Sequence, residues 1–221
     1  MDKLIICRNC ASRCTTLLAL WLSASIGQAA EVLPILQNGA LAGWENKEFK
    51  GQTHYETISR DGQSYVHALS EHAASGMFKK ITVDLNKTPF LNWRWRIEHV
   101  LANNDERSKA GDDYPARIYV VVSGGLFFWK TEAVNYVWSR NQAVGTTWPN
   151  AYTSNAQMIA VRSDAKDAGQ WVAEKRNVRA DFKAVFGSDI TQIDAIAIMT
   201  DTDNSGQSVS ADYGDIFFSA D

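Results

Sequence analysis

Alternation of apolar and polar residues with a period of two recurs along this 221-residue chain and constrains its fold more than any other feature. In residues 91–98 the odd-numbered positions are Leu, Trp, Trp and Ile, whereas the even-numbered positions are Asn, Arg, Arg and Glu. Successive side chains of a β-strand point to opposite faces of a sheet, so this pattern predicts a half-buried strand. Trp93 and Trp95 are therefore expected in the core.

Similar segments predict about ten further short strands. They are residues 53–60, 64–70, 77–83, 114–122, 126–131, 133–139, 157–162, 170–174, 192–199 and 213–219. A hairpin turn is expected at Asp61-Gly62, and one short helix at residues 179–186, which Gly187 would end. The pattern predicts an all-β fold: an antiparallel β-sandwich of jelly-roll, galactose-binding-like type with one short helix.

The first 29 residues have the features of an export signal. Three basic residues precede a short apolar core at residues 17–22, and Gly27-Gln28-Ala29 offers small residues for cleavage. The apolar core is far shorter than the ~20 residues that cross a bilayer. We expect a signal peptide at 1–29, one domain at 30–221 without a membrane span, and a periplasmic or secreted protein. All three cysteines lie in the signal, so the mature chain would form no disulfide.

The charge and the motif content limit the possible functions. The formal net charge is −3, and removal of the signal changes it to −5, so nucleic acid is not an expected partner. The sequence contains no Gly-x-Ser-x-Gly elbow, no phosphate-binding loop and no dinucleotide fingerprint. The histidines lack the spacing of a zinc site. These observations favour binding over catalysis.

An acidic segment near the C-terminus is the candidate metal site. Asp201, Asp203, Ser205 and Asp212 fall at positions 1, 3, 5 and 12 of a twelve-residue calcium loop, with Gly206 at the turn. Calcium is therefore the predicted cofactor. The alternative is a solvated turn, since Asp, Asn and Gly favour turns without an ion.

A polar strand face is the first candidate ligand site. Its residues are Arg94, Arg96, Arg117 and Tyr119, and they would form one floor if their two strands were neighbours. Asp112 and Asp113 would orient the guanidinium groups through paired hydrogen bonds. The alternative is an ion-pair ladder on a sheet face without a ligand.

Two aromatic residues form the second candidate. Trp148 and Tyr152 lie in a segment that resembles a loop, and rings on a rigid loop stack on sugar faces at low entropic cost. In the alternative interpretation they cover the ends of the sandwich.

The motifs also resemble a known family. They are Trp93-Arg94-Trp95-Arg96, Gly111-Asp112-Asp113-Tyr114-Pro115-Ala116-Arg117-Ile118-Tyr119, Tyr136-Val137-Trp138-Ser139, Asp201-Thr202-Asp203-Asn204 and Tyr213-Gly214-Asp215-Ile216. Over about residues 44–218 the chain resembles the bacterial family catalogued as domain of unknown function 3047. This resemblance implies an exported protein and supplies no catalytic residues. A weaker resemblance, to galactose-binding-like and carbohydrate-binding jelly rolls, implies structural calcium and glycan binding on a concave face or at loop tips.

We therefore expect an exported β-sandwich protein that binds a carbohydrate or another envelope ligand without catalysis. One alternative is a polysaccharide-acting hydrolase or lyase, with Asp112, Asp113 or Glu132 as acid and base. The other is an envelope assembly or scaffolding protein. A groove floored by Arg and Tyr would favour a ligand, whereas a flat aromatic patch would favour a protein partner.

Overall fold

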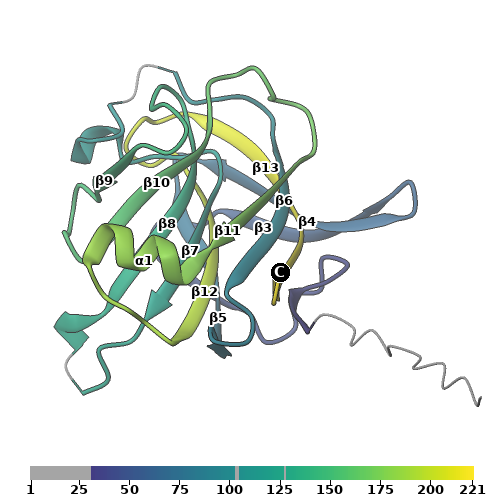
Figure 1. The fold of residues 1–221 in the computed structure, drawn as a ribbon. Helices are drawn as coiled ribbons and strands as arrows, with labels where there is room; N and C mark the ends of the chain where they lie inside the picture. The colour runs from purple at the N-terminus through teal and green to yellow at the C-terminus, as the bar shows by residue number, and fades with distance from the viewer. Residues whose placement is uncertain (1–30, 103–104, 127) are drawn as a thin grey trace, which may run out of the picture.

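The computed structural model describes residues 31–102, 105–126 and 128–221, which form two packed β-sheets and one helix (Figure 1). This architecture confirms the predicted all-β sandwich with one short helix. The predicted signal peptide lies outside the described residues. No helix within the described ranges has the length and apolar character that crossing a bilayer requires.

Sheet A has six strands. Its path is β11 (Val172–Asn177), β6 (Phe90–Ile97), β13 (Ser208–Ser219), β4 (Gln63–Glu71) and β3 (His54–Arg60), and β1 (Val32–Leu36) also pairs with β13. Its strand pairs are antiparallel. Asp61 and Gly62 join β3 to β4 with φ of 54° and 75°, which confirms the predicted hairpin, because a type I′ turn needs positive φ at both residues.

Sheet B has seven strands. Their order is β2 (Glu45–Lys50), β5 (Ala74–Asp84), β12 (Gln192–Asp201), β7 (Arg117–Val122), β8 (Glu132–Ser139), β10 (Ala156–Ser163) and β9 (Thr147–Pro149). Sheet B departs from the predicted antiparallel pattern, because β8 and β10 run parallel. A parallel pair needs a long crossover, which residues 140–155 provide, and β9 within this crossover pairs with β10 and extends the sheet by one strand.

The short helices follow local sequence signals. The helix α1 (Val178–Phe186) confirms the predicted one; the Asn177 side chain accepts from the Ala180 N–H at its start, and Gly187 ends it at φ 77°. Two 3-10 helices, η1 (Lys109–Gly111) and η2 (Phe128–Lys130), lie in loops. The strand predicted at residues 126–131 is wrong, since η2 occupies this segment.

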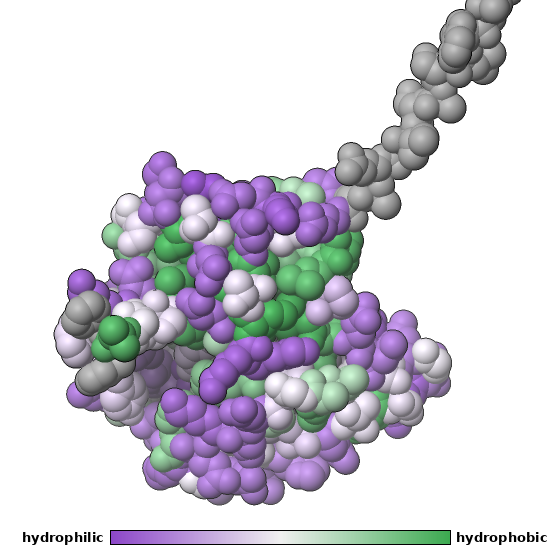
Figure 2. Space-filling view, turned by 90° about the horizontal axis from the view of Figure 1, so that it is seen from below, coloured by the Kyte–Doolittle hydropathy of each residue, from purple (hydrophilic) through white to green (hydrophobic). Residues whose placement is uncertain are grey.

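Aromatic side chains join the two sheets. Trp93 and Trp95 of β6 are 2% and 0% exposed, which confirms their predicted place in the core. Trp93 stacks on Tyr136 of β8 with ring centroids 5.3 Å apart, and Trp95 meets Trp138 at 5.9 Å. In Figure 2 hydrophobic residues form a band through the middle of the face, with hydrophilic residues on both sides of it. The outer faces of the two sheets therefore point in opposite directions.

Candidate functional site

A cleft of about 480 Å³ opens on the outer face of sheet B, and this volume is within the range of small-molecule sites. Arg117 and Tyr119 of β7 and Met199 and Asp201 of β12 form its floor. These residues alternate with core residues along their strands, and Met199 lies opposite Arg117 in the register. Loops and the end of β2 form the walls. We call this feature the sheet-B cleft.

A buried ion pair lies at the centre of the floor. Arg117 is 3% exposed, and its Nη2 donates to Asp201 Oδ2, while the Tyr114 N–H donates to Asp201 Oδ1 at 3.2 Å. The guanidinium lies over the rings of Tyr114 and Tyr119, 5.1 and 5.4 Å from their centroids. Burial raises the pKa of the Asp201 carboxyl, and the charge of Arg117 opposes that rise. The pair fixes the guanidinium in one position.

Asp112 adds a third charged group to the floor. Its Oδ1 lies 3.8 Å from Arg117 Nη1, and its Oδ2 accepts from Asn150 Nδ2 at 2.8 Å. Burial raises the pKa of Asp112, and Arg117 lowers it. Asp112 Oδ1 and Arg117 Nε and Nη1 have no hydrogen-bond partner within the described residues. These three atoms on the floor therefore have hydrogen-bonding capacity that the protein itself does not use.

Asp113 holds the loop after β12. Its carboxylate accepts from the Asn204 N–H at 3.1 Å, the Asn204 side-chain amide at 3.1 Å and the Ser205 N–H at 2.5 Å. Asp203 in this loop faces Lys50 Nζ at 3.6 Å. Burial raises the pKa of Asp203, and the nearby charge of Asp113 adds to the rise. Asp113 thus positions one wall of the cleft.

The twelve-residue calcium loop is not formed. Residues 208–219 form β13, which pairs on both sides, and Asp212 on its outer face contacts His67 and Arg96 of sheet A. Asp212 therefore lies apart from Asp201 and Asp203, which bond to groups of sheet B and its loops. Ser205 Oγ donates to the Thr202 carbonyl instead. The prediction treated residues 201–212 as one loop, whereas a strand begins at residue 208.

A different cluster of three carboxylates is a second candidate metal site. Oxygens of Asp113, Asp201 and Asp203 lie within 4.8 Å of one another. Calcium requires six to eight oxygen ligands. Arg117 already engages Asp201, and three N–H groups already engage Asp113. These residues do not fit a calcium site.

The predicted arginine floor is divided between the two sheets. Arg94 and Arg96 belong to β6 in sheet A, and Arg117 belongs to β7 in sheet B. Since outward side chains of the two sheets point in opposite directions, only Arg117 and Tyr119 share a floor. Arg94 instead donates to Gln63 at 2.9 Å.

Only one of the two predicted aromatic platform residues is exposed. Trp148 is buried on β9, the edge strand of sheet B, in a small cluster with Tyr114 and Met158, and the Arg107 guanidinium lies 5.8 Å from its ring centroid. Tyr152 lines the cleft and is 56% exposed, and its hydroxyl donates to the Asn204 side chain at 3.3 Å. The sequence reasoning missed Phe49, a lining residue from the exposed edge strand β2.

The three candidate catalytic carboxylates do not converge. Asp112 and Asp113 precede the first residue of β7, whereas Glu132 pairs with Val122 at the other end of that strand. Five residues along the strand correspond to about 17 Å. Glu132 accepts from Ser188 Oγ at 3.3 Å, outside the cleft.

Comparison with known proteins identifies a family. The model of the family described as "Protein of unknown function (DUF3047)" matches residues 42–217. No curated protein matches the chain.

Several solved structures share a weak likeness of fold. A meso-active thermo-stable cellulase derived from the Cel12A cellulase of Rhodothermus marinus has TM-score 0.43 and 9% identity, covering 85% of this chain and 100% of that chain. The cellulose induced protein Cip1 has TM-score 0.44 and 9% identity, and the match covers 80% of this chain and 91% of that chain. The xyloglucanase domain of NopAA from Sinorhizobium fredii, in complex with cellobiose, has TM-score 0.43 and 8% identity, covering 80% and 92%. At these TM-scores the likenesses carry no argument about function.

Proposed function

We propose that this chain, which belongs to the DUF3047 family of unknown function, binds a neutral carbohydrate in the sheet-B cleft without cleaving it. The observation that carries the proposal is the combination of exposed rings with hydrogen-bonding groups of both kinds around one floor. Carbohydrates present apolar ring faces together with hydroxyl groups that donate and accept.

The charges around the cleft favour a neutral ligand. Three carboxylates line it, together with two cations and two amides; these groups are Asp112, Asp201, Asp203, Arg117, Lys50, Asn150 and Asn204. The excess of negative charge disfavours an anionic sugar, since like charges repel strongly where water is partly excluded. The buried Arg117 in turn disfavours a cationic ligand.

Exposed rings come from both edges of sheet B. Phe49 is on β2, at one edge, and Tyr152 follows β9, at the other, and they are 57% and 56% exposed. Both line the hollow of the cleft, where a sugar ring can stack, and they do not form a flat patch. This arrangement favours a small ligand over the scaffolding alternative.

The polar groups supply donors and acceptors. The amides of Asn150 and Asn204 offer both kinds of group at the wall, and Asp203 offers acceptors. On the floor, Asp112 Oδ1 and Arg117 Nη1 lack a partner but are closed to solvent, so a ligand hydroxyl would bond to them only after these side chains move.

Cleavage is not part of the proposal. A glycoside hydrolase needs two carboxyl groups that flank one bond. Asp113 accepts from three N–H groups of the neighbouring loop, and Glu132 lies outside the cleft. The predicted export signal would bring the cleft to envelope polysaccharides, which are the expected source of the ligand.

Titration calorimetry with neutral cello-, xylo- and manno-oligosaccharides tests this proposal. We expect one of these series to bind, and Tyr152→Ala to weaken binding by about five- to tenfold through loss of a stacking ring. Trp129→Ala is the matched control, because Trp129 is 57% exposed and does not line the cleft.

Three outcomes would contradict the proposal. They are the absence of binding by any neutral series, equal effects of the two substitutions, and new reducing ends released from a bound oligosaccharide, which would indicate a hydrolase.

A further inference from the structure

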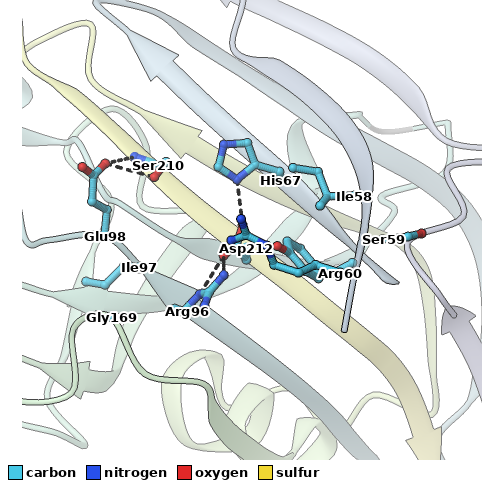
Figure 3. Close-up of a pocket in the computed structure, with 11 residues that line it drawn as sticks. Ile58, Ser59, Arg60, His67, Arg96, Ile97, Glu98, Gly169, Ser210 and Asp212 are labelled. Carbon is cyan, nitrogen blue, oxygen red and sulfur yellow. Dashed lines mark hydrogen bonds and ion pairs between the residues drawn. The ribbon is translucent and has the colours of Figure 1, made fainter. Parts of the chain in front are cut away.

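A second hollow, of about 460 Å³, lies on the outer face of sheet A, on the opposite side of the sandwich from the sheet-B cleft (Figure 3). Its wall comes from strands β3, β4, β6 and β13. The residues that matter for its chemistry are Arg60, Tyr65, His67, Arg96, Glu98 and Asp212. We call this feature the sheet-A hollow.

The carboxylate at the centre of this hollow is already satisfied. Asp212 Oδ2 accepts from Arg96 Nε at 2.8 Å and from Arg96 Nη2 at 2.5 Å, and Asp212 Oδ1 lies 2.7 Å from His67 Nδ1 (Figure 3). Its side chain is only 9% exposed. The negative charge of Asp212 is thus compensated inside the protein, and the carboxylate serves to orient Arg96 and His67.

Arg96 keeps free donors toward the hollow. A guanidinium has five N–H groups, and Asp212 uses those on one side, Nε–H and one Nη2–H. The two Nη1–H groups and the second Nη2–H have no partner in the described part of the chain, and they form a planar fork. The guanidinium carbon lies 5.8 Å from the Tyr65 ring centroid and 5.1 Å from that of Trp171. The ion pair with Asp212 and the two aromatic rings therefore hold the guanidinium fork in place before a ligand binds.

One more cation lines the same hollow. Arg60, at the β3–β4 hairpin, makes no side-chain hydrogen bond or ion pair within the described residues. His67 donates its Nδ1–H to Asp212, which leaves Nε2 of the neutral ring as an acceptor. The other carboxylate, Glu98, is 60% exposed and accepts from the Ser210 N–H and Oγ. Donors therefore exceed free acceptors, the reverse of the sheet-B cleft.

We propose that the sheet-A hollow binds an oxyanion, the carboxylate or phosphate ester group of a small molecule or saccharide. The free fork of Arg96 would take two oxygens of the anion, and Arg60 would close on it from the hairpin. This site is independent of the proposed carbohydrate cleft, because it uses other strands and the opposite face.

Calorimetric titration with glucuronate, glucose 6-phosphate and glucose tests the proposal. We expect the two anions to bind and glucose not to bind at this hollow, and the ranking of the two anions identifies the source of the oxyanion. Arg60→Gln should weaken anion binding about tenfold, and higher salt should weaken it further. Arg60 has no side-chain partner among the residues that the structure describes, so this variant is expected to fold normally.

Control variants separate the two sites. Arg179→Gln, on the exposed side of α1, should leave anion binding unchanged, as should Tyr152→Ala in the sheet-B cleft. An absence of anion binding, or an equal loss in Arg60→Gln and Arg179→Gln, would overturn the oxyanion site. Neither result would affect the carbohydrate proposal, because that proposal is tested by the binding of neutral oligosaccharides and by its loss in Tyr152→Ala.

Discussion

Replacing Arg117 by methionine should destabilise the protein by about 3–5 kcal/mol at neutral pH, because it leaves the Asp201 charge buried without its partner. The two side chains are 3% and 2% exposed, so water cannot replace the guanidinium. From the described residues, the Asp201 carboxylate would keep only the hydrogen bond from the Tyr114 N–H. Asp112 would also lose the cation 3.8 Å away, which places the cost toward the upper part of this range.

The cost should depend on pH. Burial raises the pKa of Asp201, and removal of Arg117 removes the charge that opposes this rise. In the variant the folded carboxyl therefore stays protonated to a higher pH than the unfolded one, whose pKa is about 3.9. Stability relative to wild type is then lost as pH rises above that value. Urea unfolding followed by tryptophan fluorescence at several pH values measures both effects.

A double-mutant cycle tests the reasoning. Arg117→Met combined with Asp201→Leu removes both charges, and the double variant should recover much of the loss, since apolar replacement of both partners is often nearly neutral. A cost below about 1 kcal/mol for Arg117→Met at pH 7, or a double variant as unstable as the sum of the single ones, would refute a buried, mutually dependent pair.

Three further predictions concern the same region. Burial raises the pKa of Asp112, so wild type should lose stability as pH rises from the pKa of the unfolded carboxyl to the higher pKa of the folded one. In urea unfolding, Asp112→Asn should reduce this loss, and an unchanged pH profile of stability would contradict the prediction. Melting curves with calcium and with EDTA should coincide, because the carboxylates beside Asp203 already have donors; a calcium-dependent rise that Asp203→Ala abolishes would instead support the metal site. Gly111→Ala should cost about 1–3 kcal/mol, since a Cβ there would lie 2.4 Å from the Asp105 carbonyl oxygen; chemical denaturation measures it, and an unchanged midpoint would show that the loop relaxes.

Several elements could be predicted because their signals are local. The alternation around Trp93 and Trp95 identified a strand and its buried face, and the conformational freedom of Gly62 and Gly187 identified a hairpin and a helix end. The edge strand β2 was missed because all its residues are exposed, so burial imposes no alternation on them.

The candidate site was predictable only in part. Arg117, Tyr119, Tyr152, Asp112 and Asp203 were singled out as separate groups, and they line one cleft. Their common location depends on the pairing of β7 with β12, and on loops that bring Asp112, Tyr152 and Asp203 to the same cleft. No spacing in the sequence contains that information.

By itself, the sequence determined which side chains face the core and which face outward, because the two-residue period of a strand follows from backbone geometry alone. Only the tertiary structure decided which outward groups meet. Arg96 and Arg117 have the same local pattern, yet they lie on opposite faces, because their strands joined different sheets. Strand pairing depends on contacts between segments that are distant in the sequence, such as Met199 of β12 with Arg117 of β7. The division into a cleft with excess carboxylates and a hollow with excess donors is therefore a property of the packed sandwich.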